Sequence, residues 1–134
     1  MRKFSLMFTA VLAACGGSSP MSSGGGGNVT PGASATMLDY RFSPETLRVA
    51  VGTLVQWSNG GTTDHTSTSD AAGVWNSNAV APPGPPPMTC PYPPCEGTPA
   101  GTFAFKFTTA GTYPYHCAFH GQTLGMKGVV IVGP

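Results

Sequence analysis

The chain has 134 residues, a length that suits one domain with a tail, and only 8% of its residues are charged. The formal net charge is +1, and loss of Arg2 and Lys3 with a leader would leave four basic against five acidic residues, or −1. Neither value favours nucleic-acid binding or strong electrostatic steering of a partner. No apolar run in the sequence is long enough to span a bilayer.

The first residues of the chain have the pattern of an export signal. Arg2 and Lys3 precede an apolar stretch of suitable length, which predicts a signal peptide over residues 1–14. This segment ends in Leu-Ala-Ala followed by Cys15, which resembles a bacterial lipobox, where the cysteine is lipidated and becomes the first mature residue. The alternative is an ordinary signal peptide with Cys15 incidental. The lipobox implies a lipid-anchored protein of the bacterial cell envelope, on the periplasmic or outer-surface side.

Residues 15–35 are rich in Gly and Ser and offer little apolar surface to bury. This composition predicts a flexible linker between the lipid anchor and a folded domain. The domain then spans residues 36–134. No stretch of it has a sustained helical period, so strands are the expected elements.

Strand patterns begin with a short mixed segment, 37–42, which we expect to be the first strand. Large apolar residues then occupy every second position over 47–51 and over 55–57, which predicts two half-buried strands. The sequence Asn-Gly-Gly at 59–61 is a strong turn signal. His65 follows in a Thr- and Ser-containing segment that suits an extended backbone.

Residues 82–100 form a second Pro-rich segment. No central strand tolerates this density of proline, so we expect a surface loop inserted into the domain. Cys90 and Cys95 lie inside it, and in an exported protein this spacing favours a local disulfide. A second metal site is the alternative, but the spacing is not that of a zinc knuckle and no histidine is near.

The C-terminal third carries the clearest strand patterns. Phenylalanines at 103, 105 and 107 alternate with Ala and Lys, which predicts a strand with one aromatic face. Tyr113, Tyr115 and Cys117 then share one face, so the thiol is expected to point inward. Residues 128–132 predict the closing strand. About seven to eight short strands with regular turn signals predict an all-β fold, a Greek-key β-sandwich.

A thiol, an imidazole and a thioether lie close together at Cys117, His120 and Met126. These soft donors suit copper, and one further imidazole would complete a site with two histidines, one cysteine and a weak axial ligand. His116 follows Tyr115 on the strand and should point to the opposite face. His65 is the remaining histidine of the chain and the expected fourth ligand. Gln122 is the alternative axial donor to Met126.

These residues resemble the C-terminal motif of the cupredoxins, most closely the plastocyanin and pseudoazurin branch. The motif is Cys117-Ala-Phe-His120 followed by Gly-Met126-Lys-Gly, and the segment Gly52-Thr-Leu-Val-Gln-Trp before His65 resembles the family's first-ligand region. The likeness implies a cupredoxin-like β-sandwich and one type 1 copper ion. Two departures are visible. Five residues separate His120 from Met126 where plastocyanin-like loops have four, and Thr66 stands where those proteins place an Asn that braces the thiolate.

The resemblance implies an electron-transfer protein that cycles between Cu(II) and Cu(I), is not an enzyme, and acts as a monomer with a redox protein partner. The alternative is a protein that binds, stores or delivers copper outside the cytoplasm, and a third reading is a binding module with incidental metal. Oxidases and nitrite-reducing enzymes need further copper sites, for which three histidines are too few.

The same resemblance indicates where electrons would leave. The C-terminal ligand histidine of this fold class has a ring edge near solvent, and here that residue is His120. Phe119 and Leu124 are expected to form part of an uncharged docking patch around it. His116 occupies a position where plastocyanin-like proteins often carry a surface Tyr, and it offers a second route.

Overall fold

The computed structural model describes residues 31–92 and 94–134. Cys15 and the predicted signal peptide lie outside these residues. All regular structure in the described residues is strand, and they include no helix able to cross a membrane. The strands are β1 Ala33–Leu38, β2 Arg41–Ser43, β3 Thr46–Ala50, β4 Leu54–Asn59, β5 Thr68–Ser69, β6 Thr102–Lys106, β7 Gly111–His116 and β8 Lys127–Gly133.

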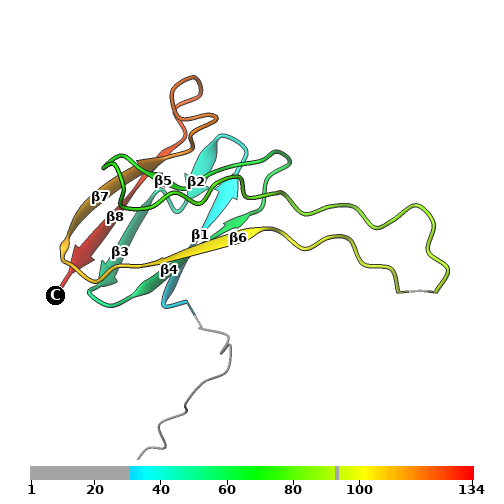
Figure 1. Ribbon diagram of the computed structural model, residues 1–134, viewed down its shortest axis with the longest axis horizontal. Coiled ribbons are helices and arrows are strands. Elements are labelled where there is room, and N and C mark those ends of the chain that lie inside the picture. Colours follow the sequence, from blue (N-terminus) through cyan, green and yellow to red (C-terminus); the bar gives the residue numbers. More distant parts are fainter. Residues whose placement is uncertain (1–30, 93) are drawn as a thin grey trace, which may run out of the picture.

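The strands form two four-stranded sheets that face each other (Figure 1). One sheet has the order β2-β1-β4-β6 and the other the order β3-β8-β7-β5. Two of the pairings are parallel, β1 with β4 and β3 with β8, and join segments distant in the sequence. The predicted all-β sandwich is therefore confirmed.

The interior is filled from both sheets by alternating side chains, as strand geometry requires. Val55 and Trp57 on β4 are fully buried against Tyr115 on β7 and Val130 on β8. The Trp57 and Tyr115 rings meet edge to face with centroids 5.5 Å apart. Cys117 continues the inward face of β7 and is also fully buried, so the predicted inward thiol is confirmed.

The N-terminal edge of the sandwich differs from its prediction. β1 begins at Ala33, inside the range 15–35 assigned to the linker, and Ala35 is buried. Residues 37–42 are also not one strand, because the chain turns at Asp39 and Tyr40 between β1 and β2. The boundary was misplaced because small residues such as alanine occur both in flexible linkers and in closely packed strands. The turn was missed because Tyr40 adopts the left-handed conformation, φ 67°, at a position where no glycine indicates it.

The described residues of the segment 82–100 contain no strand and project away from the sandwich as a long arm (Figure 1). Its two legs meet near the base, where the Gly84 N–H donates to the carbonyl of Thr98 at 2.9 Å. Cys90 and Cys95 form a disulfide near the tip, with Cα atoms 6.0 Å apart. The expected insertion is thus held at both its base and its tip.

Candidate metal centre

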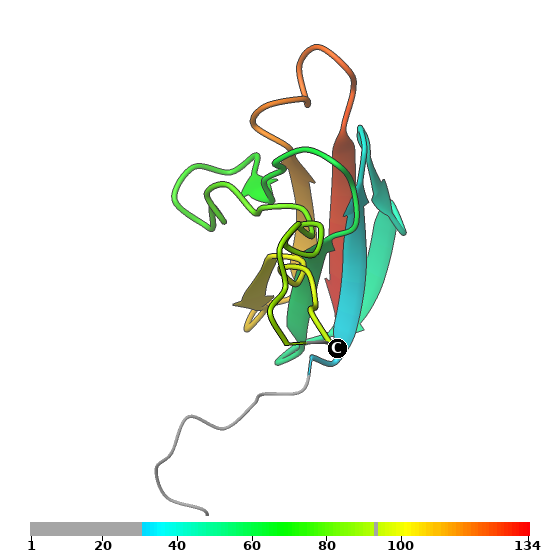
Figure 2. The ribbon, with the colours of Figure 1, turned by 90° about the vertical axis from the view of Figure 1, so that its right-hand side faces the viewer.

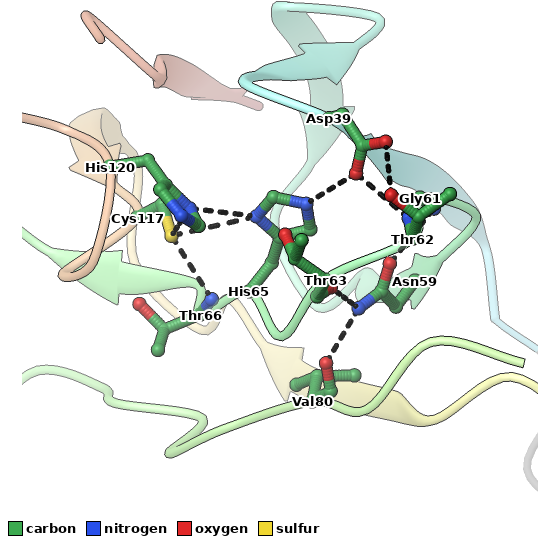
Figure 3. Close-up of polar contacts among 10 residues, drawn as sticks. All are labelled: Asp39, Asn59, Gly61, Thr62, Thr63, His65, Thr66, Val80, Cys117 and His120. Carbon is green, nitrogen blue, oxygen red and sulfur yellow. Dashed lines mark hydrogen bonds and ion pairs between the residues drawn. The ribbon is translucent and has the colours of Figure 1, made fainter.

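Three side chains converge at one end of the sandwich. His65 lies between β4 and β5, Cys117 directly follows β7, and His120 lies in the loop from β7 to β8. Figure 2 shows this last loop at the same end of the molecule as the turn between β1 and β2. The Cys117 Sγ is 3.8 Å from His65 Nδ1 and 3.5 Å from His120 Nδ1, and the two Nδ1 atoms are 3.2 Å apart (Figure 3).

The chemistry and spacing of these three atoms fit a copper ion. Thiolate and imidazole together are the donors of blue copper sites. Bonds of about 2.0–2.3 Å from nitrogen and sulfur to a central ion would separate three coplanar donors by roughly 3.5–4 Å. The observed separations, 3.2–3.8 Å, are close to that range without rearrangement of the loops. His65, Cys117 and His120 are therefore the residues that would hold the metal.

The loop from Cys117 to Met126 is shaped by its own backbone hydrogen bonds. The N–H groups of His120 and Gly121 both donate to the Cys117 carbonyl, and the Leu124 N–H donates to the His120 carbonyl. A side chain at Gly121 would collide with this backbone, since a Cβ there would lie 2.7 Å from the Cys117 oxygen. The short turn fixes the His120 ring beside the thiol three residues earlier.

Thr66 links the two loops that carry the candidate ligands. Its backbone N–H points at the Cys117 Sγ at 3.4 Å, and its hydroxyl oxygen accepts the backbone N–H of Ala118. The sequence alone did not show whether a Thr hydroxyl could replace the Asn that braces the thiolate in plastocyanin-like proteins. In the structure the hydroxyl bridges the loops.

His65 is held rigidly and is fully buried. Its backbone exchanges two hydrogen bonds with Val80, and burial lowers the pKa of its ring. A lowered pKa favours the neutral imidazole, the form that binds metals. Nδ1 faces Cys117, while Nε2 faces the carboxylate of Asp39 at 3.4 Å.

The two candidate axial residues differ in burial. Met126 is 0% exposed, and its backbone is bonded to both Cys117 and His120. The side chain of Gln122 is exposed to solvent. Met126 is therefore buried and joined through its backbone to two of the candidate ligands, whereas Gln122 is exposed.

The predicted electron-transfer residues lie around the site. Phe119 and Leu124 are each 52% exposed, and the Phe119 ring is 6.2 Å from that of His120. His116 lies on the opposite face of the strand from Cys117, as expected, and its Nδ1 contacts the Asp70 carboxylate at 2.5 Å.

Two residues near the histidines were missed by the sequence analysis. Asp39 contacts His65, and the Tyr40 ring packs edge-on against His120 with centroids 5.2 Å apart. Both belong to the turn between β1 and β2, more than twenty residues before His65. No motif marked them, and the prediction of one continuous strand placed them in regular structure.

Comparisons with known proteins agree with this geometry. A family model described as copper binding proteins, plastocyanin/azurin family, matches residues 29–133. No curated protein matches the chain. Among solved structures, a purple cupredoxin from Nitrosopumilus maritimus is 24% identical, with a TM-score of 0.50 over 75% of this chain and 99% of that one.

Structures of amicyanin variants are also similar. One reduced variant is 29% identical, with a TM-score of 0.52, and the match covers 79% of this chain and 87% of the amicyanin chain. A second variant, in a Cu(I) structure, is 27% identical with the same TM-score and coverage. The family match spans most of the chain and includes the end of the sandwich where His65, Cys117 and His120 meet. The chain belongs to the plastocyanin/azurin family of copper-binding proteins.

Proposed function

We propose that this protein is a type 1 copper electron carrier, which exchanges single electrons with a redox protein partner and has no organic substrate. The observation that carries this proposal is the convergence of one buried thiol and two imidazole Nδ1 atoms within 4.8 Å. Bound copper would supply the redox change between Cu(II) and Cu(I). His65, Cys117 and His120 would hold it, with Met126 as the weak axial ligand.

The rigidity of the donors supports electron transfer. Fast exchange needs a site that changes little between oxidation states. His65 is bonded through its backbone to Val80, and Cys117 is bonded through its backbone to Met126. Thr66 then joins the two loops. This bracing keeps the donors in place, so little has to move when an electron arrives.

Copper storage or delivery is the competing function. A delivery site has to release its metal, which favours accessible ligands. His65 and Cys117 are fully buried here, and His120 is only partly accessible. This burial favours a resident ion over a cargo ion.

The location and contacts of the carrier are also proposed. We infer a lipid anchor at Cys15, on the sequence pattern alone, and a monomer tethered in the bacterial cell envelope. The partner would dock on the exposed patch formed by Tyr40, Phe119 and Leu124 around His120. Its uncharged side chains suit a weak and transient contact.

The visible absorption spectrum of the copper-loaded protein tests the function. We expect an intense thiolate-to-copper band that Cys117→Ser abolishes. His116→Ala is the matched control, since it changes the neighbouring residue on the outer face of β7 and should keep the band. A colourless copper complex of normally folded wild type would contradict the proposal.

A further inference from the structure

The carboxylate of Asp39 is held at three points beside the buried His65. Its Oδ1 lies 3.4 Å from the Nε2 of His65, a long but charge-assisted contact (Figure 3). The backbone N–H of Thr62 donates to the same oxygen at 2.8 Å, and the Thr62 hydroxyl donates to Oδ2 at 2.8 Å. The carboxylate is thus fixed in orientation, with one oxygen directed at the imidazole.

These contacts determine which nitrogen of His65 carries the proton. Thr62 donates both of its hydrogen bonds to the Asp39 carboxylate, and a carboxylate can only accept hydrogen bonds. An acceptor facing Nε2 favours the tautomer with hydrogen on Nε2. The Nδ1 lone pair is then free toward Cys117 and His120.

The surrounding backbone is shaped to permit this contact. A Cβ at Gly61 would lie 3.1 Å from His65 Nε2 and would also collide with Asp39, so no side chain fits between them. The Gly61 N–H is held by the side chain of Asn59 at 2.9 Å. Tyr40, next to Asp39, keeps a left-handed backbone, φ 67°, which is unfavourable for a non-glycine residue. Such strain at a turn beside a site is a reason to look for a functional role.

We propose that Asp39 is a positioning residue of the copper site: its carboxylate holds the Nε2–H tautomer of His65 and would make the Nδ1 that faces Cys117 and His120 a stronger donor to bound copper. This inference rests on the proposed copper function. A histidine ligand paired with a carboxylate is more basic, and such outer partners change metal affinity by about 10–100-fold. A stronger donor stabilises Cu(II) relative to Cu(I), so Asp39 lowers the reduction potential.

Substitutions of Asp39 test the role in loaded and metal-free protein. Asp39→Asn keeps the shape and an acceptor oxygen but removes the charge. We expect it to shift the Cu(II)/Cu(I) equilibrium toward Cu(I) by about tenfold, equivalent to about 59 mV for a one-electron couple. Asp64→Asn is the matched control, because Asp64 adjoins His65 in sequence but is exposed and has no hydrogen bond to the ring. It should shift the equilibrium much less.

Nitrogen NMR of the histidine rings in metal-free protein gives a second readout. Wild type should show His65 protonated on Nε2, and Asp39→Ala should populate both tautomers. A blue wild type whose potential is unchanged in Asp39→Asn, or shifted equally by Asp64→Asn, would overturn the inference. So would an unchanged His65 tautomer in Asp39→Ala. Absence of the blue band from wild type would instead reject the copper function, and the tautomer would still decide the positioning role.

Discussion

The hydroxyl oxygen of Thr66 accepts the backbone N–H of Ala118 at 2.7 Å, and this bond ties the loop that carries His65 to the loop that begins at Cys117. The two loops are about fifty residues apart in the sequence. A single side chain therefore couples the halves of the candidate metal site, and its loss should affect both stability and the rate of electron exchange.

Thr66→Val tests this coupling. The substitution keeps the side-chain shape but leaves the Ala118 N–H without its acceptor, which should lower the free energy of unfolding by about 1–3 kcal/mol. Denaturant unfolding of the metal-free protein measures this change. Thr66→Ser retains the hydroxyl and should keep most of the stability. Equal losses in both variants would show that the hydroxyl is not the stabilising group.

Met126→Leu tests the axial ligand. The two side chains have similar volume, so the fold should lose less than about 1.5 kcal/mol. Loss of the weak thioether should raise the reduction potential while the thiolate-to-copper band remains, because the axial ligand tunes the potential. Gln122→Ala is the control. A larger change in potential from Gln122→Ala than from Met126→Leu would assign the axial role to Gln122.

Leu124→Lys tests the docking patch. A charge among the exposed side chains of Tyr40, Phe119 and Leu124 should slow electron exchange with the physiological partner and leave the copper spectrum intact. Val51→Lys is the matched control, since Val51 is also exposed but lies in the turn that follows β3, where its N–H donates to the Gly133 carbonyl. His116→Ala should have a smaller effect than Leu124→Lys. Stopped-flow rates at several salt concentrations make the comparison, and equal rates in the two Lys variants would reject the patch.

The disulfide in the arm at 82–100 should have no effect on the copper site. Its disulfide joins Cys90 to Cys95, which leaves Cys117 as the free cysteine of the described residues. We expect one reactive thiol in denatured, metal-free domain and an unchanged copper spectrum in a Cys90→Ser, Cys95→Ser double variant. Three reactive thiols in freshly purified protein would contradict the disulfide. Loss of the thiolate-to-copper band in the double variant would show that the copper site depends on the disulfide.

Cys15→Ala tests the anchor. If Cys15 is lipidated, native protein should partition into detergent, and the variant should be released or misprocessed. Mass spectrometry of the mature N-terminus identifies the first residue and any lipid. Unmodified protein that starts elsewhere than residue 15 would contradict the lipobox interpretation.

The sequence was sufficient where a residue's role follows from local pattern. The alternation through Tyr113, Tyr115 and Cys117 predicted the buried thiol. The phenylalanines at 103, 105 and 107 predicted β6, which ends at Lys106, and the buried Phe107 directly follows that strand. Both patterns arise because successive strand residues point to opposite faces. The position of His65 beside Cys117 could be expected only from donor chemistry and family resemblance, since the fold brings them together.

The turn between β1 and β2 could not be predicted in the same way. Its residues, Asp39 and Tyr40, include no glycine or proline to mark the reversal, although Tyr40 has a left-handed backbone. Asp39 meets His65 through a contact that spans 26 residues. The alanines of β1 were equally uninformative, because their burial depends on the parallel pairing with β4.

The direction of β1 has a consequence for how the protein would stand on a membrane. β1 runs from Ala33, at the end where the preceding chain enters, to Leu38, next to the turn that contacts both histidines. Six strand residues cover about 20 Å, and the start of β1 and the loop between β7 and β8 lie at opposite ends of the sandwich (Figure 1). A lipid anchor at Cys15 would therefore connect to the end of the sandwich that lies away from His120. The exposed patch around His120 would then point away from the membrane, where it could contact an electron donor and an electron acceptor in turn.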